Sequence, residues 1–494
     1  MSEFKTWRRF LKGRRLVAVL IASYVMANTA ISTIMPPPAA VSMSGEPRKA
    51  LDVVFLNDES WLDAKGNRQL SQQLFDQVLF NIDSAERLIL LDMFLFNDWQ
   101  GPIPESHRSL ASELTDALVK RKQAKPEIDV IVISDPINTV YQGLPSTHFE
   151  RLKAAGVKVS LTDLTKLQDS NPAWSGLWRW LIRPFGNSEA STLANPFGAG
   201  KVSLRSYFAL FNFKANHRKL LITDNGSDQW RALVSSANPH DGSSAHRNVA
   251  LEFGGKAVHD LMLMELALLR MNQSETAADL LENHMKSLSI DGQSDTSPDK
   301  APTIQMLGES KIHDAIIDAL SSAGAGDGVD LAMFYLSERQ IVESLKAAQR
   351  RGATIRVLLD VNSDAFGRKK NGVPNLPVAA ELHASGIPVR WCATAGEQCH
   401  AKWFHLSSAG THTFIMGSAN FTRRNLLDFN LETDVRLQTQ TGDVITSVMR
   451  DFFEQQWNNT QVRTYSLPYE AFGRDSLWLT AQYRFMEATG LSTF

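Results

Sequence analysis

Two histidine and lysine pairs stand far apart in this 494-residue chain, and in each pair the lysine follows the histidine by two positions. The first pair is His217 with Lys219, and the second is His400 with Lys402. A neutral imidazole can attack phosphorus, a protonated imidazole can donate to a leaving oxygen, and ammonium groups stabilise charge on phosphate oxygens. Residues two apart on a strand share a face. Two such strands brought together would form one cationic site for phosphodiester cleavage that requires no metal or other cofactor.

Each pair is followed by a Ser-x-Asn segment and then by a glutamate. The serine and asparagine side chains would donate hydrogen bonds to phosphate oxygens, and each glutamate would accept a hydrogen bond from a catalytic imidazole and so set its tautomer. For both glutamates the alternative is a strand-edge residue without a catalytic part. The residues concerned are Ser236, Asn238 and Glu252 in the first half and Ser418, Asn420 and Glu432 in the second.

Taken together, these elements resemble the signature of the phospholipase D superfamily, H-x-K-x4-D followed by G-S-x-N, present twice. NHRKLLITD and SSAN supply the first copy, and CHAKWFHLS and GSAN supply the second. The resemblance spans residues 53–456, and its layout is most similar to bacterial cardiolipin synthases and related membrane phospholipases. Ser407 departs from the pattern where the second aspartate would stand, and Ser235 replaces a glycine. The resemblance implies that Asp224 supports its loop rather than touching phosphate.

The resemblance also implies a phosphohistidine mechanism. In that mechanism His217 attacks phosphorus, while His400 protonates the departing alcohol and later activates water or an acceptor alcohol. The residues alone allow the reverse order. Hydrolysis and phosphatidyl transfer differ only in which acceptor reaches the phosphohistidine.

The elements that must position these residues also occur twice. Each half has a buried strand, an amphipathic helix, a second strand, and then a helix, a glycine and a further strand. The first strand, helix and second strand cover 87–96, 107–122 and 128–134 in the first half, and 328–336, 337–351 and 355–360 in the second. This order predicts an α/β fold of two similar α/β/α domains with mixed sheets and an active site at their interface.

The domain boundaries follow from the repeat and from changes in composition. A polar stretch without hydrophobic periodicity separates the two halves and reads as a linker. The predicted segments are a basic flank with a signal anchor or signal peptide at 1–48, a first phospholipase D-like domain at 49–285, the linker at 286–303, a second such domain at 304–460 and a C-terminal helical extension at 461–494.

The N-terminus carries several basic residues before an uncharged, mostly apolar run from Leu16 to about Ile34. At a rise of 1.5 Å per residue, roughly 19 residues would cross most of a hydrocarbon layer of about 30 Å, which predicts a signal anchor. The small residues Ala27, Thr29 and Ala30 leave a cleaved signal peptide as the alternative. The catalytic domains would then face the periplasm or exterior, either anchored to a bacterial inner membrane or secreted.

Cys392 and Cys399 are the only cysteines, and both precede His400 in one predicted loop. An oxidising compartment would permit a disulfide between them, and the sequence leaves their bonding open. A zinc site is less favoured, because tetrahedral zinc takes four ligands and no second Cys/His pair stands nearby.

Two further segments have two interpretations each, and a third has one. The Trp-rich segment 171–186 is typical of a membrane-interface element, or of a buried helix or interdomain lid. Residues 364–372, which include Arg368 and Lys370, are a solvated loop or a positive rim for headgroups. The C-terminal stretch around Trp478 is a helix packed on the body. The histidines near the motifs, His240, His246, His405 and His412, are expected on the surface or behind the catalytic groups.

The overall charge is nearly balanced, with 51 basic and 53 acidic residues, so nucleic acid loses weight as the main partner. The first hypothesis is therefore hydrolysis or transfer on phospholipids, cardiolipin synthesis included, at a membrane surface. An extracytoplasmic nuclease is the second, and it would bind with strong salt dependence. A non-catalytic lipid-binding relative is the third, and the retention of both His-Lys pairs opposes it. The oligomeric state is left open.

Overall fold

The computed structural model of the chain describes residues 16–17, 19–20, 22–24, 26–34, 36–37, 40–101, 107–189, 192–224, 226, 229–287, 301–365, 368–492 and 494. The predicted basic flank and most of the predicted linker at 286–303 lie outside these residues. The described residues between 16 and 34 are helical. Among the helices of the described residues, none combines the length and the apolarity needed to cross a bilayer.

The first half of the chain forms an eight-stranded mixed sheet in the order β3-β2-β11-β10-β9-β4-β5-β6. β4, β5 and β6 run parallel, and the other neighbours pair antiparallel. The strands are β2 Leu51–Leu62, β3 Arg68–Ser71, β4 Leu88–Met93, β5 Asp129–Ser134, β6 Lys158–Leu161, β9 Lys219–Asp224, β10 Trp230–Ser235 and β11 Asn248–Gly254.

The second half forms a nine-stranded sheet in the order β1-β12-β20-β19-β18-β13-β14-β17-β21. Here β13, β14 and β17 are the parallel strands. The strands are β1 Arg48–Lys49, β12 Thr303–Gly308, β13 Gly328–Met333, β14 Thr354–Leu359, β17 Val389–Cys392, β18 Lys402–Ser408, β19 Thr411–Gly417, β20 Thr433–Gln440 and β21 Ser466–Pro468. The run β20-β19-β18-β13-β14-β17 repeats the run β11-β10-β9-β4-β5-β6 of the first sheet, so the fold follows the internal repeat.

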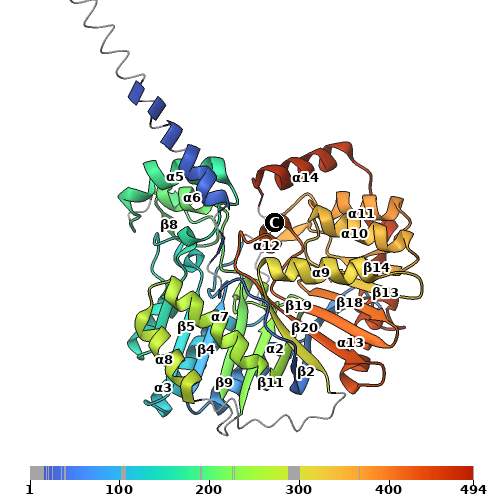
Figure 1. Cartoon of the computed structure of the whole chain (residues 1–494), viewed down its shortest axis with the longest axis horizontal. Coiled ribbons are helices and arrows are strands. Elements are labelled where there is room, and N and C mark those ends of the chain that lie inside the picture. Colours follow the sequence, from blue (N-terminus) through green and yellow to red (C-terminus); the bar gives the residue numbers. More distant parts are fainter. Residues whose placement is uncertain are drawn as a thin grey trace, which may run out of the picture.

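Helices cover the sheets on both sides (Figure 1). α2, α3 and α4 share a core with the outer face of the first sheet, and α9, α10, α11 and α14 share one with the second. α7 and α13 each pack against strands of both sheets, and α8 packs on α7. The helices are α2 Leu74–Ser84, α3 Leu110–Ala124, α4 Thr147–Ala154, α5 Pro172–Leu181, α6 Leu204–Leu210, α7 Ala257–Met271, α8 Glu275–Ser287, α9 Ser310–Ser322, α10 Arg339–Arg350, α11 Asn375–Ala384, α12 Arg423–Leu426, α13 Val444–Asn458 and α14 Leu477–Thr489.

Short elements complete the chain. They are the hairpins β7 Leu193–Ala194 with β8 Lys201–Val202 and β15 Asp364–Ala365 with β16 Arg368–Lys369, and the 3-10 turns η1 Pro136–Thr139, η2 Leu164–Lys166, η3 Arg183–Phe185, η4 Asp241–Ser243 and η5 Tyr469–Ala471.

Local sequence explains the central elements. All six residues of β4 (LILLDM) are buried, as expected for a parallel strand covered on both faces. α10 buries Ile341, Leu345 and Ala348, which recur at helical spacing on one face, and the Glu338 carboxylate caps the helix by accepting from the Ile341 amide at 2.8 Å.

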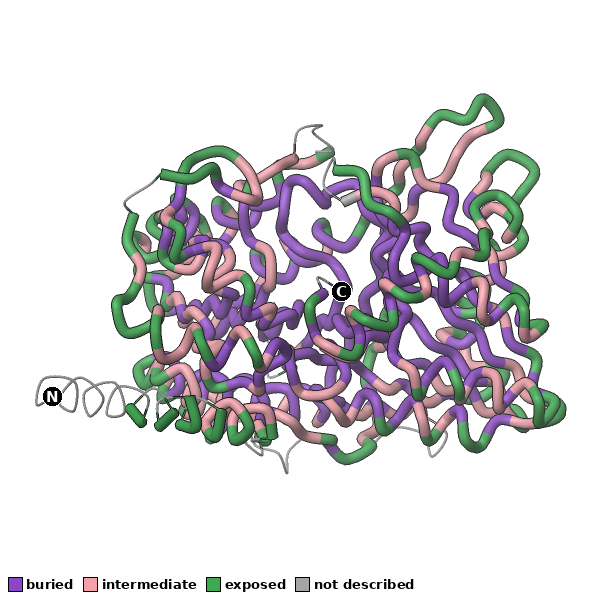
Figure 2. Tube along the Cα trace, turned by 90° about the horizontal axis from the view of Figure 1, so that it is seen from above, coloured by how far each residue is buried: buried purple, intermediate pink, exposed green. Residues whose placement is uncertain are grey.

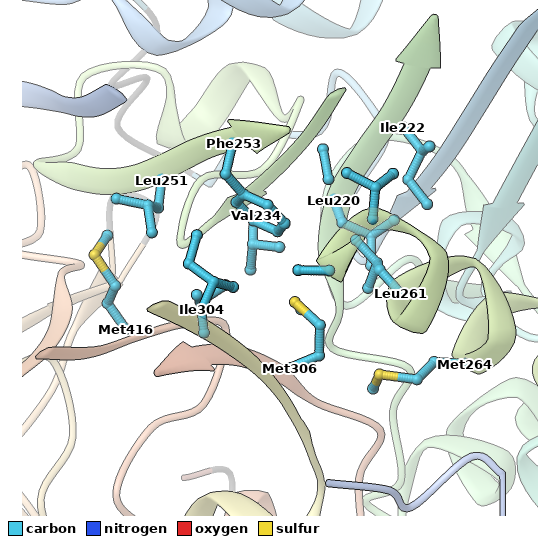
Figure 3. Packing of buried hydrophobic residues seen from close by; sticks show 14 of the residues in the cluster. Leu220, Ile222, Val234, Leu251, Phe253, Leu261, Met264, Ile304, Met306 and Met416 are labelled. Atoms are coloured by element: carbon cyan, nitrogen blue, oxygen red, sulfur yellow. The ribbon is translucent and has the colours of Figure 1, made fainter. Parts of the chain in front are cut away.

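A common core joins the two halves. Leu220 and Leu251 from the first sheet pack in one cluster with Ile304, Met306 and Met416 from the second (Figure 3). Seen from above, buried chain runs through the middle of the molecule, and the C-terminus lies near that middle (Figure 2). Separating the halves would expose this apolar surface to water, so they form one body. The predicted α/β class with two mixed sheets is confirmed.

Candidate active site

The two catalytic pairs meet where the halves join, and each histidine is held by the opposite half. His217 immediately precedes the arginine that leads into β9, and its backbone N–H donates to the Leu431 carbonyl at 2.8 Å. The His400 N–H donates to the Arg247 carbonyl at 2.9 Å. Both imidazoles line one cavity of about 450 Å³. The site therefore exists only when both halves are docked.

His217 is oriented by a carboxylate from the second half. Its Nδ1 lies 3.0 Å from the Glu432 carboxylate, which also accepts hydrogen bonds from Ser418 Oγ and Asn425 Nδ2. Burial lowers the pKa of His217 to about 4, and the Glu432 charge only partly opposes this. The imidazole is therefore neutral at pH 7. With Nδ1–H donated to Glu432, the Nε2 lone pair is free to react.

His400 has a neutral partner in place of a carboxylate. Its Nδ1 lies 3.1 Å from Asn248 Oδ1, and the same oxygen accepts a hydrogen bond from Ser236 Oγ. Burial, followed by the nearby Lys402 ammonium, holds the pKa of His400 well below its usual value. The two histidines are thus related by the repeat but differ in the charge behind them.

This arrangement corrects the role predicted for Glu252. Glu252 is only 3% exposed, and its carboxylate contacts Arg231 at 3.4 Å and Asn81 at 3.3 Å. On β11 it lies four residues beyond Asn248, roughly 13 Å at 3.3 Å per residue, so it cannot reach His400.

The error arises from unequal loops in the two halves. The serine and its acceptor are 14 residues apart in the second half, from Ser418 to Glu432, but only 12 apart in the first, from Ser236 to Asn248. The sequence prediction chose a glutamate at a similar number of residues after each histidine. In the first half this choice gave Glu252, which lies beyond Asn248, the residue equivalent to Glu432.

The lysines lie beside their own histidines. Lys219 Nζ donates to the His217 carbonyl at 2.5 Å, and Lys402 Nζ donates to the His400 carbonyl at 2.8 Å. Burial lowers the pKa of Lys219 to about 7 and that of Lys402 well below its usual value. A bound phosphate anion would favour the charged forms of both, because an opposite charge counteracts desolvation.

The asparagines and serines of the motifs occupy different places. Asn238 and Asn420 line the cavity, and Asn420 Oδ1 is buried without a hydrogen-bond partner among the described residues. Ser236 and Ser418 are not among the lining residues, because their hydroxyls bond to the groups that orient the histidines. The serines therefore position the site, and the predicted donation from serine to phosphate is corrected.

Asp224 contacts no catalytic residue. At the end of β9 its buried carboxylate accepts from the backbone N–H groups of Glu86, Arg87 and Leu88 at 3.2, 2.8 and 3.0 Å. These bonds tie β9 to the loop that enters β4. Ser407 lies opposite Gly328 in the other sheet.

Two pairs of residues in the site were not selected from the sequence. Phe94 and Phe334 follow β4 and β13, and each ring centroid lies 5.2 Å from an ammonium, that of Lys219 and Lys402 respectively. A cation over a ring face is attracted by the ring quadrupole. The repeat contained the signal, because each strand ends in a methionine that a phenylalanine follows directly.

The second pair holds the backbone before each histidine. Asp135 follows β5 and accepts from the Asn216 amide at 2.7 Å, while Asp360 follows β14 and accepts from the Cys399 amide at 2.8 Å. An aspartate after the second strand of each half was again visible in the repeat.

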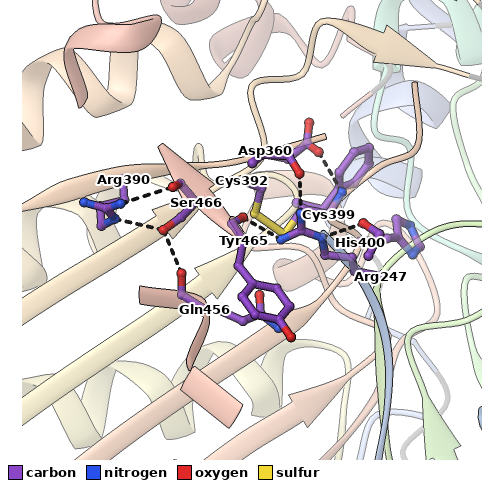
Figure 4. The surroundings of a disulfide bond; sticks show 12 residues. Arg247, Asp360, Arg390, Cys392, Cys399, His400, Gln456, Tyr465 and Ser466 are labelled. Carbon is purple, nitrogen blue, oxygen red and sulfur yellow. Dashed lines mark hydrogen bonds between the residues drawn. A yellow bond between two sulfur atoms is a disulfide. The ribbon is translucent and has the colours of Figure 1, made fainter. Parts of the chain in front are cut away.

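The loop before His400 is closed by a disulfide between Cys392 and Cys399 (Figure 4). Arg247 lies beside it, fully buried, and donates to the Tyr465 carbonyl at 2.8 Å and to Ser60 Oγ at 2.8 Å. No group of three or more His, Cys, Asp or Glu residues suited to a metal occurs within the described ranges.

The other histidines near the motifs are all buried. His240 lines the cavity and its Nε2 lies 2.7 Å from the Trp99 carbonyl, and the His246 ring lies 5.9 Å from that of His400. His405 and His412 bond to each other at 2.9 Å. His240 and His246 thus lie close to the catalytic groups. None of the four histidines is a surface residue.

Beyond the catalytic groups the cavity has an apolar wall and several cations. The apolar and aromatic lining residues include Phe94, Leu95, Trp99, Ile137, Pro196, Phe197, Leu210, Phe213, Phe334, Tyr335 and Phe494. The cationic ones are Lys214, Arg368, Lys370 and Arg424. Arg368 and Lys370 come from the 364–372 segment, so part of that segment borders the site.

Comparison with known proteins agrees with this architecture. Residues 316–457 match the family model described as "Cardiolipin synthase, PLD-like domain". The chain is similar to the solved structure of phosphatidylserine synthase from Haemophilus influenzae Rd KW20. The match covers 90% of this chain and 96% of the synthase chain, with 12% identity and a TM-score of 0.55. That likeness shows a shared two-domain fold. The predicted resemblance to the phospholipase D superfamily is thus supported by a family model over the second half of the chain and by a shared fold over both halves.

Two other solved structures match less well. Polyphosphate kinase from Porphyromonas gingivalis covers 88% of this chain and 53% of its own, with 12% identity and a TM-score of 0.43. Nuc, a phospholipase D family member from Salmonella typhimurium, covers 33% of this chain and 99% of its own, with 20% identity and a TM-score of 0.26. With TM-scores below 0.5, these likenesses do not define the fold. No curated protein sequence gives a significant match.

Proposed function

We propose that this chain is a phospholipase D-type enzyme that cleaves a phospholipid phosphodiester and transfers the phosphatidyl group to water or an alcohol. The observation that carries the proposal is the single cavity lined by His217, His400, Asn238 and Asn420, one histidine and one asparagine from each half. The family model and the shared fold support the same class of reaction.

The chemistry divides between the two histidines. The bound phosphodiester anion favours the protonated form of His400, against the burial that lowers its pKa in the empty site. His217 Nε2 attacks phosphorus, a P–N bond forms, and the bond from phosphorus to the headgroup oxygen breaks as this protonated His400 donates its proton to that oxygen. Water or an acceptor alcohol then gives its proton to His400 and attacks phosphorus, and the P–N bond breaks. The atoms balance without a further reactant.

The unequal partners of the histidines support this order. A nucleophilic imidazole becomes positive when phosphorylated, and the Glu432 carboxylate at 3.0 Å stabilises that charge on His217. His400 must gain and lose a proton in each cycle, and the neutral Asn248 amide does not trap its charged form.

The cavity walls favour a lipid over a nucleic acid. Aromatic and aliphatic side chains make up much of the lining, and the formal net charge of −2 provides no general attraction for polyanions. The nuclease remains the alternative, and the oligonucleotide in the experiment below tests it.

Two apolar surfaces support a position on a membrane. α5 and α6 lie at the same end of the molecule as α14, on the other half (Figure 1). α14 buries Leu479 and Tyr483 against the body, but Leu477 is 87% and Trp478 75% exposed, which helix packing on the body does not explain. Leu181 is also exposed on α5. Large exposed apolar side chains are typical of lipid-binding surfaces.

The N-terminal helix approaches the same end, because the Tyr24 ring lies 4.7 Å from that of Trp180 at α5. We therefore propose that this end rests on a lipid surface. The disulfide supports an extracytoplasmic location, because such bonds persist in oxidising compartments.

The deciding experiment uses the purified chain with EDTA, phospholipid vesicles and a single-stranded oligonucleotide. We expect headgroup release or a transfer product from the vesicles, lost in both His217→Ala and His400→Ala and kept in His284→Ala, a control on α8 away from the cavity. Cleavage of the oligonucleotide alone would replace the lipid function with the nuclease. Substantial lipid turnover by either catalytic variant would refute the shared site.

The membrane surface is tested by vesicle flotation. The double variant Leu477→Ser with Trp478→Ser should float less than the wild type, since it removes exposed apolar surface at the proposed contact. The matched control, Val444→Ser with Val448→Ser, removes exposed apolar side chains from α13 at the other end (Figure 1). Equal flotation of the two double variants would exclude α14 from the membrane contact.

A further inference from the structure

The cavity holds more positive charge than one phosphodiester requires. A phosphodiester carries a single negative charge, and Lys219 and Lys402 already lie beside the two histidines. Four further Lys and Arg side chains line the cavity, whereas none of its described lining residues is Asp or Glu. Lys214 is neutralised outside this lining, because its Nζ lies 2.6 Å from Asp169. The catalytic scheme gives no role to the positive charges of the other three, Arg368, Lys370 and Arg424.

Arg424 is the most confined of these cations. Its Nη2 donates to the carbonyl and hydroxyl of Ser492, and its guanidinium lies 5.2 Å from the Phe213 ring. Its Nε is buried and has no hydrogen-bond partner among the described residues. Burial lowers the pKa of Arg424 to about 10, so it is still charged at neutral pH. The Glu487 carboxylate only partly opposes this lowering, and the direct hydrogen bonds of the guanidinium go to the neutral Ser492, so the desolvated cation gains from an anion placed beside it.

The position of Arg424 links it to the catalytic centre. It lies in the short segment between Asn420, which lines the cavity, and Glu432, which orients His217. The next residue, Asn425, donates directly to the Glu432 carboxylate. An anion bound to Arg424 would therefore fix the position of the substrate through the loop that also holds Glu432, the carboxylate behind His217.

Lys370, from the 364–372 segment, provides a second cation. It is exposed, lines the cavity and donates from Nζ to the Tyr335 hydroxyl at 2.8 Å. The Tyr335 ring is itself part of the cavity wall. A flexible lysine at the rim and a confined arginine deeper in the wall suit an anionic group that enters from solvent.

We infer that Arg424, assisted by Lys370, forms a subsite for a second anionic group, a carboxylate or phosphate carried by the headgroup or the acceptor in addition to the scissile phosphodiester. This inference rests on the proposed function and narrows it to acidic substrates. Arg424 is then a residue that determines specificity, because its charge-assisted bonds exist only with such substrates.

The experiment compares donor lipids dispersed in neutral detergent micelles, so that surface charge is constant. The headgroups are choline, serine, which adds a carboxylate, and glycerophosphate, which adds a phosphate. The wild type should favour at least one acidic headgroup over choline in kcat/KM by about tenfold or more, as one charge-assisted hydrogen bond allows. The headgroup preferred identifies whether carboxylate or phosphate is the natural group.

Arg424→Gln should lower kcat/KM for the acidic lipid about tenfold more than for the choline lipid, which abolishes the preference. Arg424→Lys should keep part of the preference and guards against a folding defect in the first variant. Arg423→Gln is the matched control, since Arg423 stacks on Phe429 at 4.5 Å and does not line the cavity.

The outcomes separate the two levels of the proposal. If both Arg424 variants lose kcat/KM equally on acidic and neutral lipids, or if the wild type shows no preference, the proposed subsite is wrong and the proposed lipid function still holds. Absence of wild-type turnover on every lipid would overturn the proposed function and the subsite with it.

Discussion

Replacing Glu432 by Gln tests the carboxylate that distinguishes the two histidines. Glutamine preserves the size of the side chain and can still accept the Nδ1–H of His217, but it removes the negative charge. Glu432 does not line the cavity, so the change should lower kcat and leave KM nearly unaltered.

The size of the effect follows from the distance between the charges. Nδ1 lies 3.0 Å from the carboxylate oxygen, so the centres of charge in a phosphorylated or protonated imidazole and the carboxylate are about 4 Å apart. At an effective dielectric constant of about 20 the attraction is about 4 kcal/mol. Allowing for the lysine charges that Glu432 also balances, we expect kcat to fall on the order of 100- to 1000-fold.

The assay is headgroup release at saturating lipid, with Glu252→Gln as the matched control. Both are buried glutamates, but Glu252 contacts Arg231 and lies away from the histidines, so its variant should retain activity within about twofold. A Glu432→Gln enzyme that keeps more than about a tenth of wild-type kcat would refute the charge argument. Equal losses in both variants would mean that Glu252, rather than Asn248, acts on the chemistry.

Three further predictions concern stability and protonation. Asp224→Asn should lower the free energy of unfolding by roughly 1–3 kcal/mol in a urea titration, since three backbone amides lose a charged acceptor, while kcat per folded molecule is unchanged; an inactive but fully stable variant would contradict this. Replacing Cys392 and Cys399 by Ser should lower the free energy of unfolding by about 2–3 kcal/mol, the value expected for closing a loop of this size. It should also lower kcat, because the disulfide holds the loop before His400, and reduction of the wild type should have the same two effects. With the pKa of Lys219 at about 7, about a quarter of its ammonium is formed at pH 7.5, so binding of a simple phosphodiester anion, which does not itself titrate there, should take up at least about three quarters of a proton and weaken as pH rises. Lys402, whose pKa is also lowered, adds to this uptake. Calorimetry in buffers of different ionisation enthalpy measures the uptake, and proton release would refute it.

The repeat in the sequence predicted the fold because buried parallel strands form nearly continuous apolar runs, such as LILLDM in β4 and GVDLAM in β13, each interrupted by one aspartate. The catalytic pairs were predictable for a related reason. A histidine and a lysine at the start of a strand keep their spacing whatever the lengths of the loops around them, as His217 and Lys219 show.

The acceptor behind His400 was not predictable in this way. Which residue of β11 faces the imidazole depends on the loop after Asn238, and that loop is two residues shorter than its counterpart, which moves Asn248 rather than Glu252 into place. The direction of the Ser236 hydroxyl likewise depends on the turn around it. Apolar spacing along α14 indicated a packed helix, but it could not show that Trp478 lies on the face left open.

The backbone bonds between the halves also bear on when the enzyme becomes active during its synthesis. His217 is made early, but the Leu431 carbonyl and the Glu432 carboxylate that position it are added more than 200 residues later. A nascent or truncated first half therefore carries its nucleophile without the groups that orient it. If the proposed function holds, the chain is therefore expected to be inert toward lipids until both halves are complete and docked.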